Sequence, residues 1–219
     1  MEPRTHLNEE LKELHERILK MGALVEEALH KAVRALTDED EALAQEVIRG
    51  DDEIDRIHNE LEDFATRIIA LEQPVATDLR ELITSTKLAG GLERIGDHAR
   101  HIAKIATTLP QPVLAVTLPS IQRMAEIGIG MVHDSLTAFV DEDVVAAREV
   151  ADRDDEIDAE HRALYQTLVE MMQNHPEWIV HGVDLMFLNR FLERLGDHVT
   201  NMCEWVVFAK TGMHLELNK

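Results

Sequence analysis

The sequence is poor in cysteine and in aromatic residues. Its 219 residues include one cysteine, Cys203, and aromatic side chains make up only 4% of the chain. A single cysteine excludes an internal disulfide and a zinc site built from several thiolates. The apolar helical surroundings of Cys203 predict a buried, inert thiol. No stretch shows the sustained two-residue alternation of a half-buried strand, so the sequence favours an all-helical protein.

Basic residues are also scarce. The chain has 22 lysines and arginines against 43 acids, and its net charge is -21 with neutral histidines. Because nucleic acids are held mainly through Lys and Arg contacts to phosphate, this balance argues against nucleic-acid binding. It also disfavours direct docking to an anionic membrane. An acidic excess fits metal cations, basic protein surfaces or simple solubility.

Long apolar runs are missing as well. No run approaches the roughly 20 residues of a membrane-spanning helix, and residues 1–6 lack the apolar region of a signal peptide. We therefore expect a soluble, cytoplasmic protein. The sequence has no glycine-rich phosphate loop, no nucleophile elbow and no serine or cysteine set beside a base, so we expect that it is not an enzyme.

The most informative feature that is present is a repeat. Residues 92–98 read Leu-Glu-Arg-Ile-Gly-Asp-His, and residues 192–198 repeat them with a single Ile-to-Leu change. Upstream, Asp-Asp-Glu-Ile-Asp occurs at residues 51–55 and again at residues 154–158. Self-similarity at a nearly fixed shift indicates a duplicated structural unit.

Apolar residues spaced three and four apart predict six amphipathic helices. They cover about residues 7–36, 43–71, 79–105, 121–136, 141–172 and 185–206. Thr37 or Asp38 is the expected N-cap of the second helix, and Thr77 or Asp78 that of the third. Pro119 suits the first turn of the fourth helix, and Gly212 suits the end of the sixth.

These helices predict an all-α protein made of two tandem three-helix bundles, related by the internal repeat and by pseudo-two-fold symmetry. We place the first bundle at residues 1–109, a linker at 110–118 and the second bundle at 119–219. The linker region is rich in proline and has no charged residue. Packing of all six helices into one long bundle is the alternative.

Each repeat carries two pairs of acids spaced four residues apart, which places both members of a pair on one helix face. If the two helices of a repeat pack together, four carboxylates meet and require a counter-ion. Oxygen ligands of this kind suit Mg, Mn, Fe or Zn. The candidate metal ligands are Asp51, Asp55, Glu93 and Asp97 in the first repeat and Asp154, Asp158, Glu193 and Asp197 in the second.

Two other interpretations of the acids stay open. Composition alone yields roughly eight acidic pairs at this spacing, most of them solvated. Arg56, Arg94 and Arg194 could instead neutralise the carboxylates in a structural network. Several histidines lie near the acids. His58 and His161 lie one helical turn beyond an acid, so they are either additional ligands or residues at the edge of the core. His98 and His198 directly follow an acid and point about 100° away from it, so we expect them to be exposed or to support a ligand.

Glycines inside the third helix, Gly90, Gly91 and Gly96, each cost roughly 1 kcal/mol against alanine. This cost suggests either close helix packing or space for a bound group.

The repeated Leu-Glu-Arg-(Ile/Leu)-Gly-Asp-His signature, the Asp-Asp-Glu-Ile-Asp repeats and the stretch Pro-Val-Ala-Thr-Asp-Leu-Arg at residues 74–80 resemble the PhoU family of phosphate-uptake regulators. The resemblance spans essentially the whole chain. It implies two three-helix bundles and metal clusters, often of iron or zinc, held by the eight acids named above. Many members carry a further acid just before the Leu-Glu-Arg run, where this chain has Gly91 and Phe191, and the 74–80 stretch has no clean second copy. The number of metals and the equivalence of the two sites therefore stay open.

Functionally, the resemblance implies a non-enzymatic cytoplasmic regulator. Such proteins link a phosphate ABC-transporter ATPase to a sensor histidine kinase and repress the phosphate-starvation response when phosphate is ample. They reach the membrane only through these partners, and a homodimer is compatible with the family. The alternatives are a metal-dependent enzyme and a metal storage or delivery protein built on the carboxylate clusters.

Overall fold

The computed structural model describes residues 3–217, and all regular structure in that range is helical. The first repeat forms α1 (Pro3–Asp38), α2 (Glu41–Glu72) and α3 (Ala76–Ala106). A short helix, α4 (Gln111–Leu114), follows, and the second repeat forms α5 (Leu118–Val140), α6 (Val144–Asp152), α7 (Asp154–Asn174) and α8 (Ile179–Thr211). A single 3₁₀ turn, η1 (Pro176–Trp178), joins α7 to α8.

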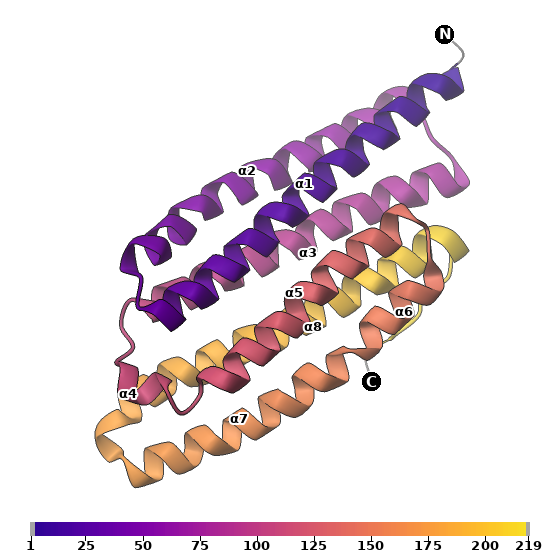
Figure 1. The fold of residues 1–219 in the computed structure, drawn as a ribbon. Coiled ribbons are helices and arrows are strands. Elements are labelled where there is room, and N and C mark those ends of the chain that lie inside the picture. The colour runs from indigo at the N-terminus through magenta and orange to yellow at the C-terminus, as the bar shows by residue number, and fades with distance from the viewer. Residues whose placement is uncertain (1–2, 218–219) are drawn as a thin grey trace.

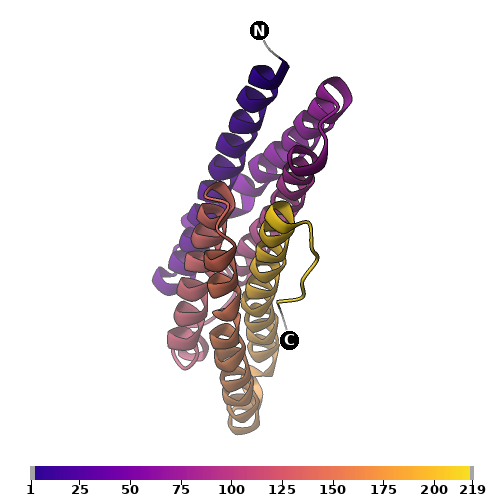
Figure 2. The same ribbon diagram turned by 90° about the vertical axis from the view of Figure 1, so that its right-hand side faces the viewer.

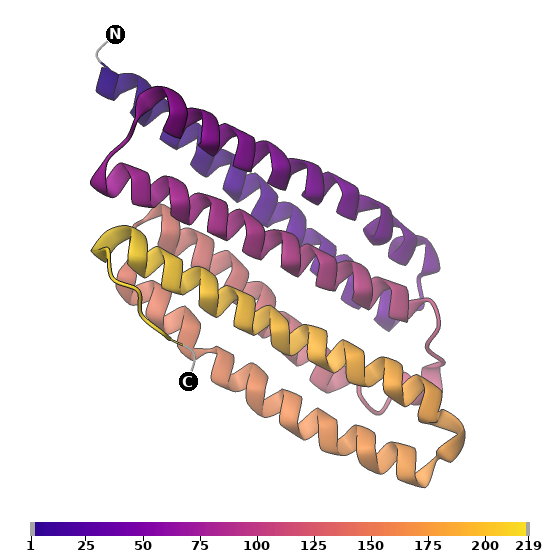
Figure 3. The same cartoon turned by 180° about the vertical axis from the view of Figure 1, so that it is seen from behind.

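The helices form two three-helix bundles that lie side by side (Figure 1). On one side of the molecule, α2, α3, α8 and α7 follow one another in that order, and α1 and α5 cover the other side (Figures 1 and 3). Seen after a quarter turn, the segment beyond α8 folds back along that helix (Figure 2). There the backbone amide of Leu217 donates to Glu204 at 2.8 Å.

Equivalent helices of the two bundles pack against each other in opposite directions. α3 contacts α8, and α1 contacts α5. Thr84 of α3 donates to the carbonyl of Trp205, and farther along α3 His98 stacks on His198. Residue numbers in α8 therefore fall as those in α3 rise, so the two helices are antiparallel. Contacts between equivalent elements, as in an isologous dimer, indicate a two-fold relation. The predicted pair of bundles with pseudo-two-fold symmetry is therefore confirmed, and the exact limits at residues 109 and 119 stay a prediction.

One apolar core runs through both bundles. It is made of apolar residues from all the long helices, among them the fully buried Ile18, Leu92 and Leu192. Cys203 is also buried, and burial raises the pKa of its thiol to about 12, as expected for an inert cysteine. Among the described residues, no helix is long and apolar enough to cross a membrane.

Two of the predicted helix starts are wrong. Asp40 caps α2, accepting a hydrogen bond from the amide of Leu43, because Thr37 still belongs to α1 and bonds back to the carbonyl of Val33 at 2.9 Å. α3 begins at Ala76 with Val75 at the cap position and no side-chain cap, so Thr77 and Asp78 lie within its first turn. Gly212 ends α8 in the left-handed conformation, with φ 73°, as predicted.

The predicted fifth helix is divided into two. α6 ends at Asp152 and α7 begins at Asp154, with Arg153 between them. The Arg153 side chain reaches α5, where it contacts Asp134 at 2.6 Å and donates to the carbonyl of Ile127 at 3.3 Å. This tertiary contact anchors the chain at the break.

Candidate functional site

The first predicted set of acids comes together where α2 packs on α3. We call Asp51, Asp55, Glu93 and Asp97 the first quartet. Asp51 is almost fully buried, with 3% exposure, and the other three are half-buried. The charges of these three raise the pKa of Asp51, as does burial, its largest cause. The structure thus gathers the four carboxylates into one electrostatically coupled site.

A cation supplied by the protein already contacts this quartet. The guanidinium of Arg100 lies 2.7 Å from Asp51 and 2.5 Å from Asp97, bridging α2 and α3. Arg94 lies farther out, at 3.5 Å from Glu93 and 3.8 Å from Asp97. Arg100 lowers the pKa of Asp51 and so opposes burial. The first quartet is therefore partly neutralised by an ion network, which was one of the two interpretations left open by the sequence. Its main cation is Arg100, which the sequence did not single out.

The second set of acids, where α7 packs on α8, has the same layout. We call Asp154, Asp158, Glu193 and Asp197 the second quartet. Asp154 is buried, with 7% exposure, and the others are half-buried. A Cβ atom added at Gly196 would lie only 2.0 Å from Oδ1 of Asp154, so glycine provides the space for this carboxylate. Close packing around the acid explains the glycine of the repeated signature.

The second quartet differs from the first in its charge balance. The position of Arg100 is taken by Thr200, which is 1% exposed. Burial, followed by the charges of Asp197 and Asp158, raises the pKa of Asp154 to about 7. The arginines here contact the outer acids: Arg190 pairs with Glu193, and Arg162 lies 3.0 Å from Asp158. Burial and the neighbouring negative charges thus favour either protonation of Asp154 or binding of a cation next to it.

Other predicted neighbours of the quartets occupy different roles. Arg56 pairs with Glu53 and Glu60 on its own helix. His58 lies 3.5 Å from Glu62. Burial raises the pKa values of Glu93 and Glu193, and the charges of His58 and His161 respectively oppose part of this shift. Both histidines thus lie within electrostatic reach of a quartet glutamate.

A different group of residues already has the spacing of a metal site. Among the described residues, His6, Glu10 and Glu72 form the one group of three or more potential ligands whose donor atoms all lie within 4.8 Å of one another. His6 Nδ1 lies 3.2 Å from Glu72 and 3.7 Å from Glu10. The pairing of His6 with Glu10 is visible as a four-residue spacing, but Glu72 arrives from the far end of α2 and only the fold reveals it.

The donor chemistry of both quartets fits a hard or borderline cation, although neither has that close spacing in this structure. In the second quartet, burial and three further carboxylates raise the pKa of Asp154, and Thr200 stands where the first repeat has Arg100. In the first, Arg100 holds the position that a cation would take between Asp51 and Asp97. The residues therefore fit a metal better in the second repeat.

The signature histidines lie between the two bundles. His98 is buried, with 8% exposure, which corrects the expectation that it is exposed, and His198 is half-buried. Their rings stack at 5.4 Å between centroids, and Phe191 stacks on His98 at 5.4 Å and on His101 at 5.0 Å. Burial, helped by the charge of His198, lowers the pKa of His98 to about 4. Sequence reasoning missed this contact because it compared each histidine only with its own helix.

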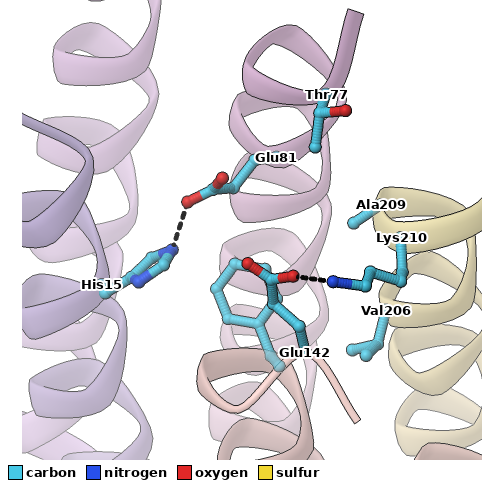
Figure 4. Close-up of a pocket in the computed structure, with 8 residues that line it drawn as sticks. His15, Thr77, Glu81, Glu142, Val206, Ala209 and Lys210 are labelled. Atoms are coloured by element: carbon cyan, nitrogen blue, oxygen red, sulfur yellow. Dashed lines mark hydrogen bonds and ion pairs between the residues drawn. The ribbon is translucent and has the colours of Figure 1, made fainter. Parts of the chain in front are cut away.

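A small hollow lies near one end of the interface between the bundles (Figure 4). His15 lies 2.9 Å from Glu81, and Lys210 pairs with Glu142, so ion pairs close two of its sides. Its volume is about 20 Å³, enough for little more than one water molecule. We interpret it as a packing junction.

The chain is similar to known proteins along both repeats. The PhoU domain matches it twice, over residues 18–106 and 121–206. The "phosphate-specific transport system accessory protein PhoU homolog" of Clostridium acetobutylicum is 35% identical over 95% of this chain and 96% of that protein.

Two solved structures are similar over nearly their whole length. The crystal structure of the phosphate transport system regulatory protein PhoU from Streptococcus pneumoniae has a TM-score of 0.89 and 32% identity, covering 95% of this chain and 99% of that one. That of PhoU from Pseudomonas aeruginosa has a TM-score of 0.88 and 34% identity, covering 94% and 99%. Because both repeats match the domain and the relatives are matched end to end, the chain belongs to the PhoU family.

Proposed function

We propose that this protein is a regulator of phosphate transport and not an enzyme. The observation that carries the proposal is the end-to-end similarity to proteins named as accessory or regulatory components of phosphate transport. Both repeats take part in this similarity, and neither bundle carries an added domain within the described residues.

In finer detail, the protein acts in the cytoplasm as an adaptor between a phosphate ABC-transporter ATPase and a sensor histidine kinase. It represses the phosphate-starvation response when phosphate is ample, and it reaches the membrane only through these partners. The charge of -21 favours partners with basic surfaces. A homodimer, which is compatible with the family, stays a prediction.

One surface of the molecule suits such an adaptor. At the start of α8, Val180, Val183 and Phe187 lie on one helix face and are 71%, 45% and 57% exposed. Exposed apolar side chains gathered on one face are a common feature of binding surfaces. We assign this row to contact with a partner of the regulator.

The proposal also includes metal binding by the quartets. Asp154, Asp158, Glu193 and Asp197 hold a cation, iron or zinc in preference to magnesium or manganese. Asp51, Asp55, Glu93 and Asp97 hold a second one more weakly, because Arg100 must first move away. A bound cation would supply positive charge that lets the buried carboxylates stay ionised and so fixes α7 against α8.

Complex formation with purified partners tests the adaptor role. We expect the intact chain to bind the transporter ATPase and the kinase in size-exclusion or surface-binding experiments. Replacing Val183 and Phe187 with serine should weaken at least one complex, because it removes the apolar row. Tyr165→Ser, which removes another exposed ring, 47% exposed, from α7, is the matched control. Failure of the unaltered protein to bind either partner would contradict the adaptor role.

A further inference from the structure

We propose that the contact between the two repeats contains a binding site for a small tetrahedral oxyanion of the phosphate class. A hollow of about 280 Å³ opens where the middle of α3 crosses the middle of α8. Arg94, His98 and His101 line it from α3, and Phe191, Arg194 and His198 line it from α8. We call it the axial pocket, because equivalent residues of the two repeats meet there. The proposal does not depend on the proposed function.

The charge in the axial pocket is opposite to that of the protein. The chain carries 43 acids and only 22 lysines and arginines, yet two of the arginines line this one hollow, beside three histidines that can donate hydrogen bonds. The single carboxylate in the lining, Asp97, is 2.5 Å from Arg100, which draws its charge away from the pocket. A small anion would therefore find two guanidinium groups in this one hollow.

The arginines are suited to an oxyanion. A guanidinium offers several N–H donors in a plane and can bind two oxygens of one anion at once. Arg94 is 63% exposed in its side chain, and its contacts with Glu93 and Asp97 are long, at 3.5 and 3.8 Å. Arg194 enters the same pocket from the other repeat. An anion between the two would join α3 to α8.

His98 supplies the independent sign of a missing ligand. Its side chain is buried, with 8% exposure, and neither ring nitrogen has a hydrogen-bond partner within the described residues. Burying a polar group without a partner carries a free-energy penalty, so such a group calls for an explanation. The ring faces are covered by Phe191 and His198, which leaves the ring edge to donate a hydrogen bond. An oxyanion in the pocket would accept it.

The same geometry is unfavourable for a metal ion. The rings of His98 and His198 are nearly parallel, with 26° between their planes, and face each other at 5.4 Å. A histidine binds a metal through a nitrogen lone pair that lies in the plane of its ring. Two stacked rings direct these lone pairs along parallel planes and not toward one shared metal ion. Two arginines in the lining would also repel a cation. A polyanion such as nucleic acid would in turn be repelled by the overall charge of -21.

Calorimetric titration of the intact, chelator-treated protein with inorganic phosphate tests the site. Removing metal ensures that binding does not arise from a cation in a quartet. We expect saturable binding of phosphate and competition by sulfate, with no effect of equal ionic strength of chloride. A parallel titration with ATP distinguishes free phosphate from the phosphoryl group of a nucleotide. Absence of saturable binding for phosphate and ATP alike would overturn the proposal.

Variants locate the binding. Arg94→Gln and Arg194→Gln should each lower the affinity roughly tenfold, the value of one charge-assisted hydrogen bond. Arg56→Gln removes the same charge from the outer face of α2 and should leave the affinity unchanged. His98→Phe keeps a stacked ring but loses both nitrogens, and should also weaken binding. Equal affinity in all four variants would place the anion elsewhere and overturn the proposal.

A spectroscopic readout separates binding from general destabilisation. In NMR spectra of the intact protein, the ring signals of His98 and His198 should move as phosphate is added. The signal of His30, which is exposed on α1, should stay in place. Thermal unfolding of each variant without phosphate verifies that it is folded. Shifts confined to histidines outside the axial pocket would contradict the assignment.

Discussion

The guanidinium of Arg100 lies 2.7 Å from the buried carboxylate of Asp51, whereas Thr200 takes the position of this arginine in the second repeat. The two quartets therefore share their carboxylates but not their counter-charge. This difference leads to a specific expectation for metal binding.

Exchanging the two residues should exchange the metal affinities of the quartets. Arg100→Thr removes the competing cation and should tighten metal binding in the first repeat roughly tenfold, which corresponds to about 1.4 kcal/mol. Thr200→Arg should weaken it in the second repeat. Zinc or iron titration followed by elemental analysis measures both changes. Lys104→Thr, which removes an exposed charge one turn along α3, is the control. Identical metal content and affinity in all variants would contradict the role of Arg100.

The raised pKa of Asp154 predicts how stability changes with pH. Its pKa is about 7 in the folded protein, against 3.8 for an ordinary aspartate, so the folded state binds the extra proton between these values. The contribution of Asp154 to the free energy of unfolding of the metal-free protein should therefore fall as pH rises from about 4 to 7. Asp154→Asn should remove this dependence and stabilise the metal-free protein at pH 8 by about 2–4 kcal/mol.

Urea unfolding with a chelator at several pH values makes this measurement. Asp155→Asn changes the neighbouring exposed acid and should reduce the slope far less, because its charge raises the pKa of Asp154 less than the charges of the other quartet acids do. A stability profile of Asp154→Asn that parallels the unaltered protein would show that this carboxylate is not held in an unfavourable charged state.

His98 predicts a pH effect of the opposite sign. Its pKa is about 4 in the folded protein, below its usual 6.5, so the unfolded chain binds the proton more readily. The contribution of His98 to stability should be complete above about pH 6.5 and should fall by about 3 kcal/mol as the pH drops toward 4. His98→Phe should reduce that loss in acid unfolding experiments. His30→Phe, on the exposed face of α1, should not.

Two glycines in helices should respond differently to alanine. A Cβ added at Gly128 would lie 2.3 Å from Cδ2 of the buried Leu195, so Gly128→Ala should destabilise the protein by about 1–3 kcal/mol. A Cβ at Gly50 meets no atom within 4 Å, so Gly50→Ala should be neutral or stabilise α2 by roughly 0.5–1 kcal/mol. Chemical unfolding of the two variants checks both signs. A destabilised Gly50→Ala protein would contradict this account of the packing.

The fold was accessible from the sequence because it depends on local periodicity and on the repeat. Spacings of three and four residues locate the long helices, and Gly212 marks the end of the last one. The predicted helix limits are wrong where a side-chain contact, local or distant, has more influence than the spacing of apolar residues. Thr37 bonds back into its own helix, which moves the cap to Asp40. Arg153 contacts α5, and the helix breaks there although the apolar pattern continues.

The sites were only partly accessible from the sequence. Acids four apart, such as Asp51 and Asp55, locate both quartets because they lie on one helix face. The partners that arrive from other helices are not encoded in any short spacing. Arg100 reaches across to Asp51, and Glu72 reaches His6 from the far end of α2. The stacking of His98 on His198 likewise depends on how the two repeats pack.

The regulatory role is tested most directly by the output of the phosphate-starvation response. We would delete the gene in its native host and measure a starvation-controlled reporter in phosphate-rich medium, with the unaltered gene restored on a plasmid as the comparison. The account predicts high reporter activity without the protein and repression once it is restored. Reporter activity that stays low in the deletion strain, and equal to that of the restored strain, would contradict a role as negative regulator.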